Sequence, residues 1–589
     1  MSKFFVHDLR LAFRLVIVFL FLGHTLAAQD LQSIYQNLKS PNSRKLQISG
    51  GLNISNSSYY SEGIAARRDA WQWLIGANLN LRFLGINAPF AMYFSDGNKA
   101  YRLPSYTFTG ISPSYKWATL HLGDRNMNFS RYSLSGIMFR GLGFELKPGK
   151  WYAGAMYGRL SRATREDLGA LQRIDPVYKR IGYGAKLGYQ GNNTSVGLSW
   201  FGAGDDENSI ATPQLSTVLP TLNAVLSLQA SQRLGRKLNL EGEMAHSATN
   251  TNKWATELNT TDRDAGNTLL GVFKPNESVQ TGNAWRANAQ YALKVASLTA
   301  GYERIDQGFR TLGALFFLSD VERITGGFNT NLWKNKITLM TNGGVERTDL
   351  SGAERNGARR LIGSLSASCN PTERLSFNGS YSNFQNTAKL RTVNDPANLV
   401  DSLILAQVTQ NISLGASLTE GDPKEPGIWS INLSRQSANS IVNDAVQADA
   451  KSKFFTTSLF YAKTRPAGLW NWSAGLSWSN TQLAALSTNI LSPTLTASRS
   501  FFKNTLHTSS RASYNTFLTQ GTDNSAAFNV GLTTDYQLAK SNKIGMDVSL
   551  INRTGADNDF LELYGRVFYA YSFQNGNPKK RPAKSEGNQ

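Results

Sequence analysis

The strongest candidates for acid–base chemistry in this sequence are its histidines, and only His121, His246 and His507 lie beyond residue 30. Nucleophilic catalysis needs such a base held beside a nucleophile and oriented by a third group. His121 alternates with Leu120 and Leu122, which places it on the polar side of a predicted strand. The residue spacing does not place a nucleophile and an orienting group beside any one of these histidines. We therefore predict that the protein is not an enzyme, and we interpret His121 as a solvated histidine.

An acidic turn formed by Asp205, Asp206, Glu207 and Asn208 is the best candidate for a metal site. Its side chains offer several hard oxygen ligands, which is the type that calcium prefers. The ligand spacing of an EF-hand is absent, and the competing interpretation is an acidic turn that is simply solvated. Cys369 is the only cysteine, so an internal disulfide and a site with several thiolate ligands are excluded. We predict no cofactor.

Arginine is concentrated between residues 102 and 180. Its planar guanidinium matches the geometry of phosphate groups. We expect these side chains to bridge lipid phosphates or to favour anions at the mouth of a pore, and the competing interpretation is a solvated basic rim. The candidates for the lumen or the rim are Arg125, Arg131, Arg159, Arg162, Arg165 and Arg173.

The formal net charge of +20, from 61 basic and 41 acidic residues, raises nucleic acid as a partner. The basic residues are, however, scattered singly through predicted strands and turns, without a basic helix or a nucleic-acid-binding module. A polyanionic lipid surface or an anion-attracting lumen fits this distribution better. We therefore predict no nucleic-acid partner.

The N-terminus has the pattern of a secretory signal peptide. Lys3, Arg10 and Arg14 precede an apolar run at 15–22, and small residues follow at 25–28. The run is shorter than the ~20 apolar residues that a spanning helix needs, so a membrane anchor is the weaker interpretation. The predicted boundaries are 1–28 for the signal peptide and 29–44 for a periplasmic lead.

Alternating residues indicate β-strands along the rest of the chain. From Trp71 to Phe83, apolar side chains occupy every second position and small or polar ones lie between them. The same period of two recurs at 183–189, 375–381 and 528–536. A protein without apolar helices can stay in a membrane only as a closed barrel, because all backbone hydrogen bonds must then be made between strands.

The lengths of the connections distinguish a membrane barrel from a soluble β-sandwich. Short turns such as 147–150 and 334–336 alternate with long polar stretches such as 204–222 and 437–449. Short periplasmic turns and long external loops are typical of outer-membrane barrels. We therefore predict an all-β fold: a single large antiparallel transmembrane β-barrel over 45–573, with about 26 strands (range 22–26).

The last predicted strand carries the features of a C-terminal insertion signal. Its apolar face ends on an aromatic residue, a pattern that resembles the signal read by barrel-insertion machinery. We predict that residues 574–589 form a basic, disordered periplasmic tail. The residues assigned to the insertion signal are Gly565, Tyr569, Tyr571 and Phe573.

Several stretches resemble outer-membrane β-barrel proteins of Bacteroidota. They are SPSYKWATLHLGDRNMNFSRYSLSGIMFRGLGFELKPGKWYAGAMYGRL from residue 112, GAGDDENSI from residue 202 and YERIDQGFRTLGALFFLSDVE from residue 302. The resemblance implies residence in the outer membrane of a Gram-negative bacterium, and it implies no activity or site residue. The TonB-dependent receptors of that phylum carry a globular plug before the barrel. Strands are predicted from about residue 45 here, so we do not expect uptake of that type.

We expect a porin-like channel that passes solutes, with both termini in the periplasm. The alternative is a structural, assembly or secretion component whose barrel is occupied, with segments 249–281 and 387–402 folded into the lumen. A third interpretation is a secreted, soluble β-rich adhesin. The expected partners are outer-membrane lipid, lipopolysaccharide and the barrel-insertion machinery. The sequence indicates no further protein partner.

Overall fold

A computed structural model describes most of the chain between residues 46 and 575. The predicted signal peptide (1–28), the predicted periplasmic lead (29–44), almost all of the predicted tail and Arg173 lie outside the described residues. The described ranges are 46–96, 107–166, 176–211, 218–258, 274–314, 319–348, 350, 359–390, 403–442, 445–465, 470–483, 486–521, 524–555 and 559–575.

The described residues form strands and connections, and none of them forms a helix long and apolar enough to span a membrane. The strands are β1 (Gln47–Glu62), β2 (Trp71–Phe83), β3 (Ile86–Ser95), β4 (Thr107–Ile111), β5 (Ser114–Tyr115), β6 (Ala118–Asn126), β7 (Met138–Leu146), β8 (Trp151–Ser161), β9 (Lys179–Gln190), β10 (Thr194–Asp206), β11 (Leu222–Leu234), β12 (Leu238–Asn250), β13 (Val279–Ala292), β14 (Ala296–Ile305), β15 (Val321–Leu332), β16 (Ile337–Thr348), β17 (Arg359–Cys369), β18 (Leu375–Leu390), β19 (Leu403–Glu420), β20 (Gly427–Val442), β21 (Ala445–Arg465), β22 (Trp470–Leu483), β23 (Leu486–Phe501), β24 (Leu506–Thr519), β25 (Ser525–Ala539), β26 (Asn542–Thr554) and β27 (Phe560–Gln574).

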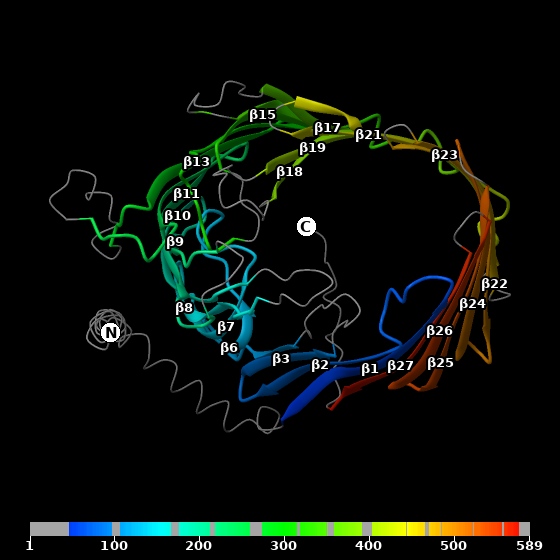
Figure 1. Ribbon diagram of the computed structural model, residues 1–589, viewed down its shortest axis with the longest axis horizontal. Helices are drawn as coiled ribbons and strands as arrows, with labels where there is room; N and C mark the ends of the chain where they lie inside the picture. The colour runs from blue at the N-terminus through cyan, green and yellow to red at the C-terminus, as the bar shows by residue number, and fades with distance from the viewer. Residues whose placement is uncertain are drawn as a thin grey trace, which may run out of the picture.

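The strands close into one barrel. They pair antiparallel around the sheet, and β1 pairs with β27 from Ser49↔Gln574 to Glu62↔Leu561. In Figure 1 the strands form a ring in which β1 (blue) lies beside β27 (red). The short β4 and β5 both lie between β3 and β6, so the 27 described strands occupy 26 positions. The predicted barrel and its strand number are confirmed.

The outer face of the barrel is apolar, as the alternation predicts. On β10, Val196 and Leu198 are 43% and 48% exposed, whereas Ser199 and Phe201 on the opposite face are buried. Exposed leucine, tryptophan and tyrosine side chains recur on the same face around the ring. An apolar band on the outside and a more polar inside are characteristic of transmembrane barrels.

The two ends of the barrel differ in the length of their connections. At one end, which we call the turn end, tight turns join the strands; Gly149 there has a positive φ of 63°. At the other end, which we call the loop end, the connections are longer, as between β6 and β7. The prediction of a long connection at 437–449 is wrong, because β20 and β21 run through most of it with a register shift after Asn439. The residues there are mostly polar, but they continue the backbone hydrogen bonding between the two strands, and this bonding does not require apolar side chains.

Strand β27 carries the four residues of the predicted insertion signal on its outer face. The rings of Tyr571 and Phe573 are stacked with centroids 5.4 Å apart, and the Tyr569 hydroxyl donates to Asn542 Oδ1 at 2.6 Å. Gly565 is paired with Ser58 of β1. These residues therefore lie at the seam where the barrel closes, and their recognition by insertion machinery stays a prediction.

Candidate functional site

Two connections from the loop end fold against the inner wall of the barrel. They are residues 127–137, between β6 and β7, and residues 306–314, after β14; together we call them the inner ledge. In Figure 1 the first of these connections (cyan) turns toward the inside of the ring. The ledge packs on the inner faces of β8–β15, which we call the covered wall.

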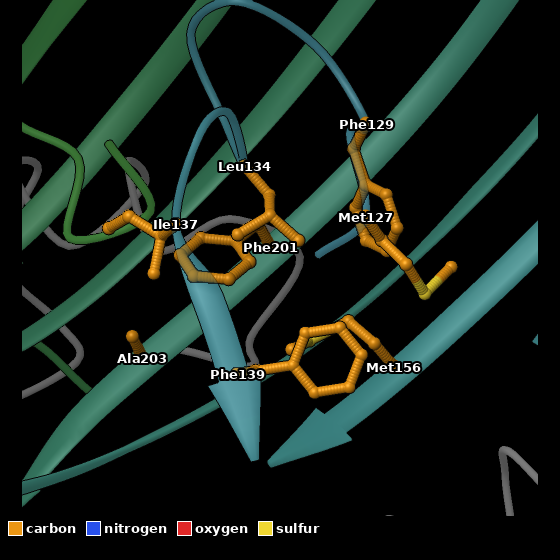
Figure 2. Packing of buried hydrophobic residues seen from close by; sticks show 8 residues of the cluster. All are labelled: Met127, Phe129, Leu134, Ile137, Phe139, Met156, Phe201 and Ala203. Carbon is orange, nitrogen blue, oxygen red and sulfur yellow. The ribbon is translucent and has the colours of Figure 1, made fainter. Parts of the chain in front are cut away.

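An apolar cluster anchors the first half of the ledge. Phe129 and Leu134 of the ledge pack with Phe139 of β7 and with Met156 and Phe201 of the covered wall, and Leu134 and Phe201 are fully buried. Figure 2 shows Leu134 beside Phe201, and Phe139 beside Met156. Burial of these side chains is the main favourable term for docking the ledge, because transfer of apolar surface from water stabilises by roughly 25 cal/mol per Å².

A second cluster joins both halves of the ledge to the wall. The Tyr132 and Phe309 rings are fully buried and meet edge to face, with centroids 5.9 Å apart. Small apolar side chains of five strands lie beneath these two rings. They are Val225, Ala245, Ala284, Ile305 and Val321.

The two halves are also hydrogen-bonded to each other. The Ser135 N–H donates to the Gly313 carbonyl at 2.9 Å, and the Thr311 hydroxyl donates to the Ser133 carbonyl at 2.7 Å. Gly313 is required at this contact, because a methyl group there would collide with the Ser133 carbonyl oxygen. Buried backbone groups in irregular segments need such partners, so the ledge has one defined structure.

A charge network ties the ledge to β14–β16. The Tyr132 hydroxyl donates to Glu303 Oε1 at 2.8 Å, and Arg131 lies 3.2 Å from the same carboxylate. Arg323 bridges Glu303 at 3.1 Å and Glu346 at 2.6 Å. Burial, together with the negative charge of Glu303, raises the pKa of the Tyr132 phenol. Tyr132 therefore stays protonated and acts as a donor.

His121 faces the inside of the barrel and takes part in a polar chain. The Ser112 hydroxyl and His121 Nδ1 are 2.9 Å apart, and His121 Nε2 lies 3.6 Å from Glu145. Lys186 holds Glu145 at 2.6 Å and donates to the Asn128 carbonyl of the ledge at 2.8 Å. These residue types occur in hydrolytic triads, but here the carboxylate is bound by lysine and is beyond hydrogen-bond distance from the imidazole. The prediction that the protein is not an enzyme stays a prediction.

The inner faces of β22–β24, which we call the bare wall, have no cover of this kind. No described residue of these three strands is buried. Ser498, Ser500, His507 and Ser509 line a pocket of about 180 Å³ near the turn end. The Ser500 hydroxyl and His507 Nδ1 are 2.7 Å apart. The bare wall therefore presents hydroxyl groups and an imidazole to the lumen.

Arg511 also lies on the inner face of β24, between Thr496 and Gly531 in register. Its side chain is exposed. No described carboxylate lies within ion-pair distance of it, whereas two inward basic residues of β26 and β27 are paired. Those pairs are Lys543–Asp535 at 2.9 Å and Arg566–Asp547 at 2.5 Å.

The carboxylates of the calcium candidate are paired with basic side chains. Asp205 is buried and bonds Arg180 at 2.8 Å, Asp206 lies 3.2 Å from Lys179, and Glu207 lies 2.8 Å from Lys253. The Asn208 N–H donates to Asp206. In the described part of the chain, no group of three or more histidine, cysteine or acidic residues is placed to hold a metal. Calcium binding stays a prediction, and a cation there would compete with three ion pairs.

The basic candidates do not form one site. Arg125 donates to the carbonyl oxygens of Pro89, at 3.0 Å, and Gly110. Arg131 belongs to the ledge network. Arg159 lies on the outer face of β8, and Arg162 and Arg165 are exposed beyond the end of that strand.

Sequence reasoning missed the inner ledge and pointed to other segments. In the predicted segment 249–281, Lys253 donates to the Asp205 carbonyl at the end of β10, and the Trp254 ring lies 6.4 Å from that of Tyr178, which precedes β9. In the segment 387–402, residues 391–402 lie outside the described residues. A signal for the ledge was present, because 127–137 has too many apolar residues for a solvated loop.

No protein-family model matches the chain, and no curated protein matches it. Among solved structures, the translocation pore of the P pilus usher PapC is 12% identical, over 90% of this chain and 100% of that chain, with a TM-score of 0.35. The ferric enterobactin receptor PfeA from Pseudomonas aeruginosa is 11% identical, over 89% and 80%, with a TM-score of 0.38. OccK2 (OpdF) from Pseudomonas aeruginosa, in complex with glucuronate, is 9% identical, over 89% and 98%, with a TM-score of 0.29. At these identities and scores the likeness goes no further than the barrel form.

Proposed function

We propose that the protein is an outer-membrane channel and that solutes pass along the bare wall. The observation that carries this proposal is the contrast inside the barrel: the ledge covers β8–β15, whereas β22–β24 have no buried residue on either face. Inward serine and threonine side chains suit a water-filled lumen. A barrel of this strand number has an interior wide enough for such a passage.

We infer that the channel prefers anions. Arg511 presents an exposed positive charge on the bare wall, whereas inward Lys543 and Arg566 are neutralised by carboxylates. Fixed charges that line a pore raise the local concentration of counter-ions and so bias permeation.

The orientation that fits this proposal places the turn end in the periplasm and the loop end outside the cell. The even number of strand positions brings both ends of the barrel sheet to the same side, and short periplasmic turns are the general pattern in such barrels. The resemblance to Bacteroidota proteins and the predicted signal peptide support residence in the outer membrane of a Gram-negative bacterium.

Planar-bilayer recording of the purified protein tests the function. We expect a large, steady conductance, and an anion-selective reversal potential across a KCl gradient that Arg511→Gln moves toward zero. Arg159→Gln is the matched control, because it removes the same charge from the outer face of the barrel. An unchanged reversal potential in Arg511→Gln would remove the anion preference, and the absence of conductance would favour the occupied barrel.

A further inference from the structure

The outer face of β7 and β8 carries a concentration of positive charge near the loop end. Arg140 and Arg159 are directly opposite each other in the register of the two strands. They share this face with Leu142 and Tyr157, which are each 50% exposed. Arg162 follows the end of β8 and is exposed. The arginines thus lie at the edge of the apolar band that faces lipid.

The charge at this place is not balanced by the described residues. Among the described carboxylates, only that of Asp124 pairs with one of these arginines. Arg140 donates to both Asp124 oxygens, with Nε 2.8 Å from Oδ1. Arg162 is close enough to interact electrostatically with both Asp124 and Arg159. In the described part of the chain, neither Arg159 nor Arg162 has a carboxylate of its own. Like charges directly opposite on neighbouring strands are destabilising, so this arrangement favours an external anion.

The same end of the barrel shows a balanced arrangement elsewhere. Arg304, on the outer face of β14, lies 3.4 Å from Asp306, which directly follows that strand, and Arg347, on the outer face of β16, lies 3.0 Å from Glu322. These arginines therefore have their counter-charges within the protein. The surplus of positive charge on β7–β8 is therefore not shared by the outer face of β14–β16.

We propose that Arg140, Arg159 and Arg162 form a binding site for a phosphate group of an outer-leaflet glycolipid of the lipopolysaccharide type. Guanidinium groups bind phosphate through paired, charge-assisted hydrogen bonds. The apolar band beside the site, with Leu142 and Tyr157, is positioned to contact acyl chains, and this favours a lipid over a free anion as the source of the phosphate. The proposal rests on the loop end facing outward, and it does not depend on conduction through the lumen.

Native mass spectrometry of the full-length protein in detergent, with added lipid A that carries both phosphates, tests the site. Arg159→Gln combined with Arg162→Gln should weaken lipid binding on the order of tenfold, because two charge-assisted contacts are lost. The matched control is Arg304→Gln combined with Arg347→Gln, which removes equal charge from the balanced face and should bind lipid A as the wild type does. A shift on heating in gel electrophoresis verifies that each barrel is folded.

Equal lipid binding by the wild type and the Arg159/Arg162 double variant would overturn the proposal. Equal binding of dephosphorylated lipid A by the wild type would overturn it as well, because the phosphate would then not be recognised. Displacement of lipid A by excess inorganic phosphate at the same site would show that the source is a free anion. If the double variant does not fold, Arg162→Gln alone, beyond the strand end, should weaken binding severalfold, and unchanged binding would contradict the site.

Discussion

The covered wall and the bare wall belong to the same barrel but have opposite inner faces. On the covered wall, Phe201 and Val225 point inward and are fully buried under the ledge. On the bare wall, the corresponding inward positions include Ser498 and Ser509, which remain partly exposed. Apolar side chains in a lumen gain stability only when something covers them, whereas hydroxyl groups can remain in water. The inner residue type of each strand thus determines which side of the lumen stays accessible.

The largest change to this contrast is expected from Tyr132→Ala. The substitution removes a fully buried ring and its bond to Glu303, which should destabilise docking of the ledge by about 3–5 kcal/mol. With the ledge detached, single-channel recordings should show a larger and noisier conductance. Tyr132→Phe keeps the ring packing and should stay close to the wild type. If Tyr132→Ala conducted as the wild type does, the claim that the ledge covers one wall and limits the open lumen would be wrong.

A smaller effect is expected from Glu303→Gln. In this variant Arg131 and Tyr132 lose their charged acceptor, while Arg323 keeps its ion pair with Glu346. Docking of the ledge should therefore be destabilised by about 1–3 kcal/mol. The ledge should then open more often, and trypsin should cleave after Arg131 faster than in the wild type.

The matched control for that experiment is Glu322→Gln. Glu322 has a comparable set of partners, Arg347 and Tyr302, but they lie on the outer face. Cleavage after Arg131 should be unchanged in this variant. Equal acceleration in both variants would show that the charge network does not hold the ledge.

The barrel itself could be predicted from the sequence, because alternation and connection length are local features. The apolar residues of 127–137 indicate a buried connection, but the position of the ledge could not be predicted, because it depends on contacts between segments as distant as Ser133 and Thr311, which are 178 residues apart. The face of β8 on which the Arg159 side chain lies could not be predicted either. Along β8, small and apolar residues occupy both faces, so the alternation does not say which side is lipid-facing.

The most direct test compares one inward serine on each wall in a Cys369→Ser background. Ser509→Cys lies on the bare wall, and Ser227→Cys lies on the covered wall, where Ser227 is fully buried. We expect a negatively charged thiol reagent, added to the open channel in a planar bilayer, to reduce the current through Ser509→Cys and to leave Ser227→Cys unchanged. Rapid modification of Ser227→Cys, or no effect on Ser509→Cys, would contradict the assignment of one covered and one conducting wall.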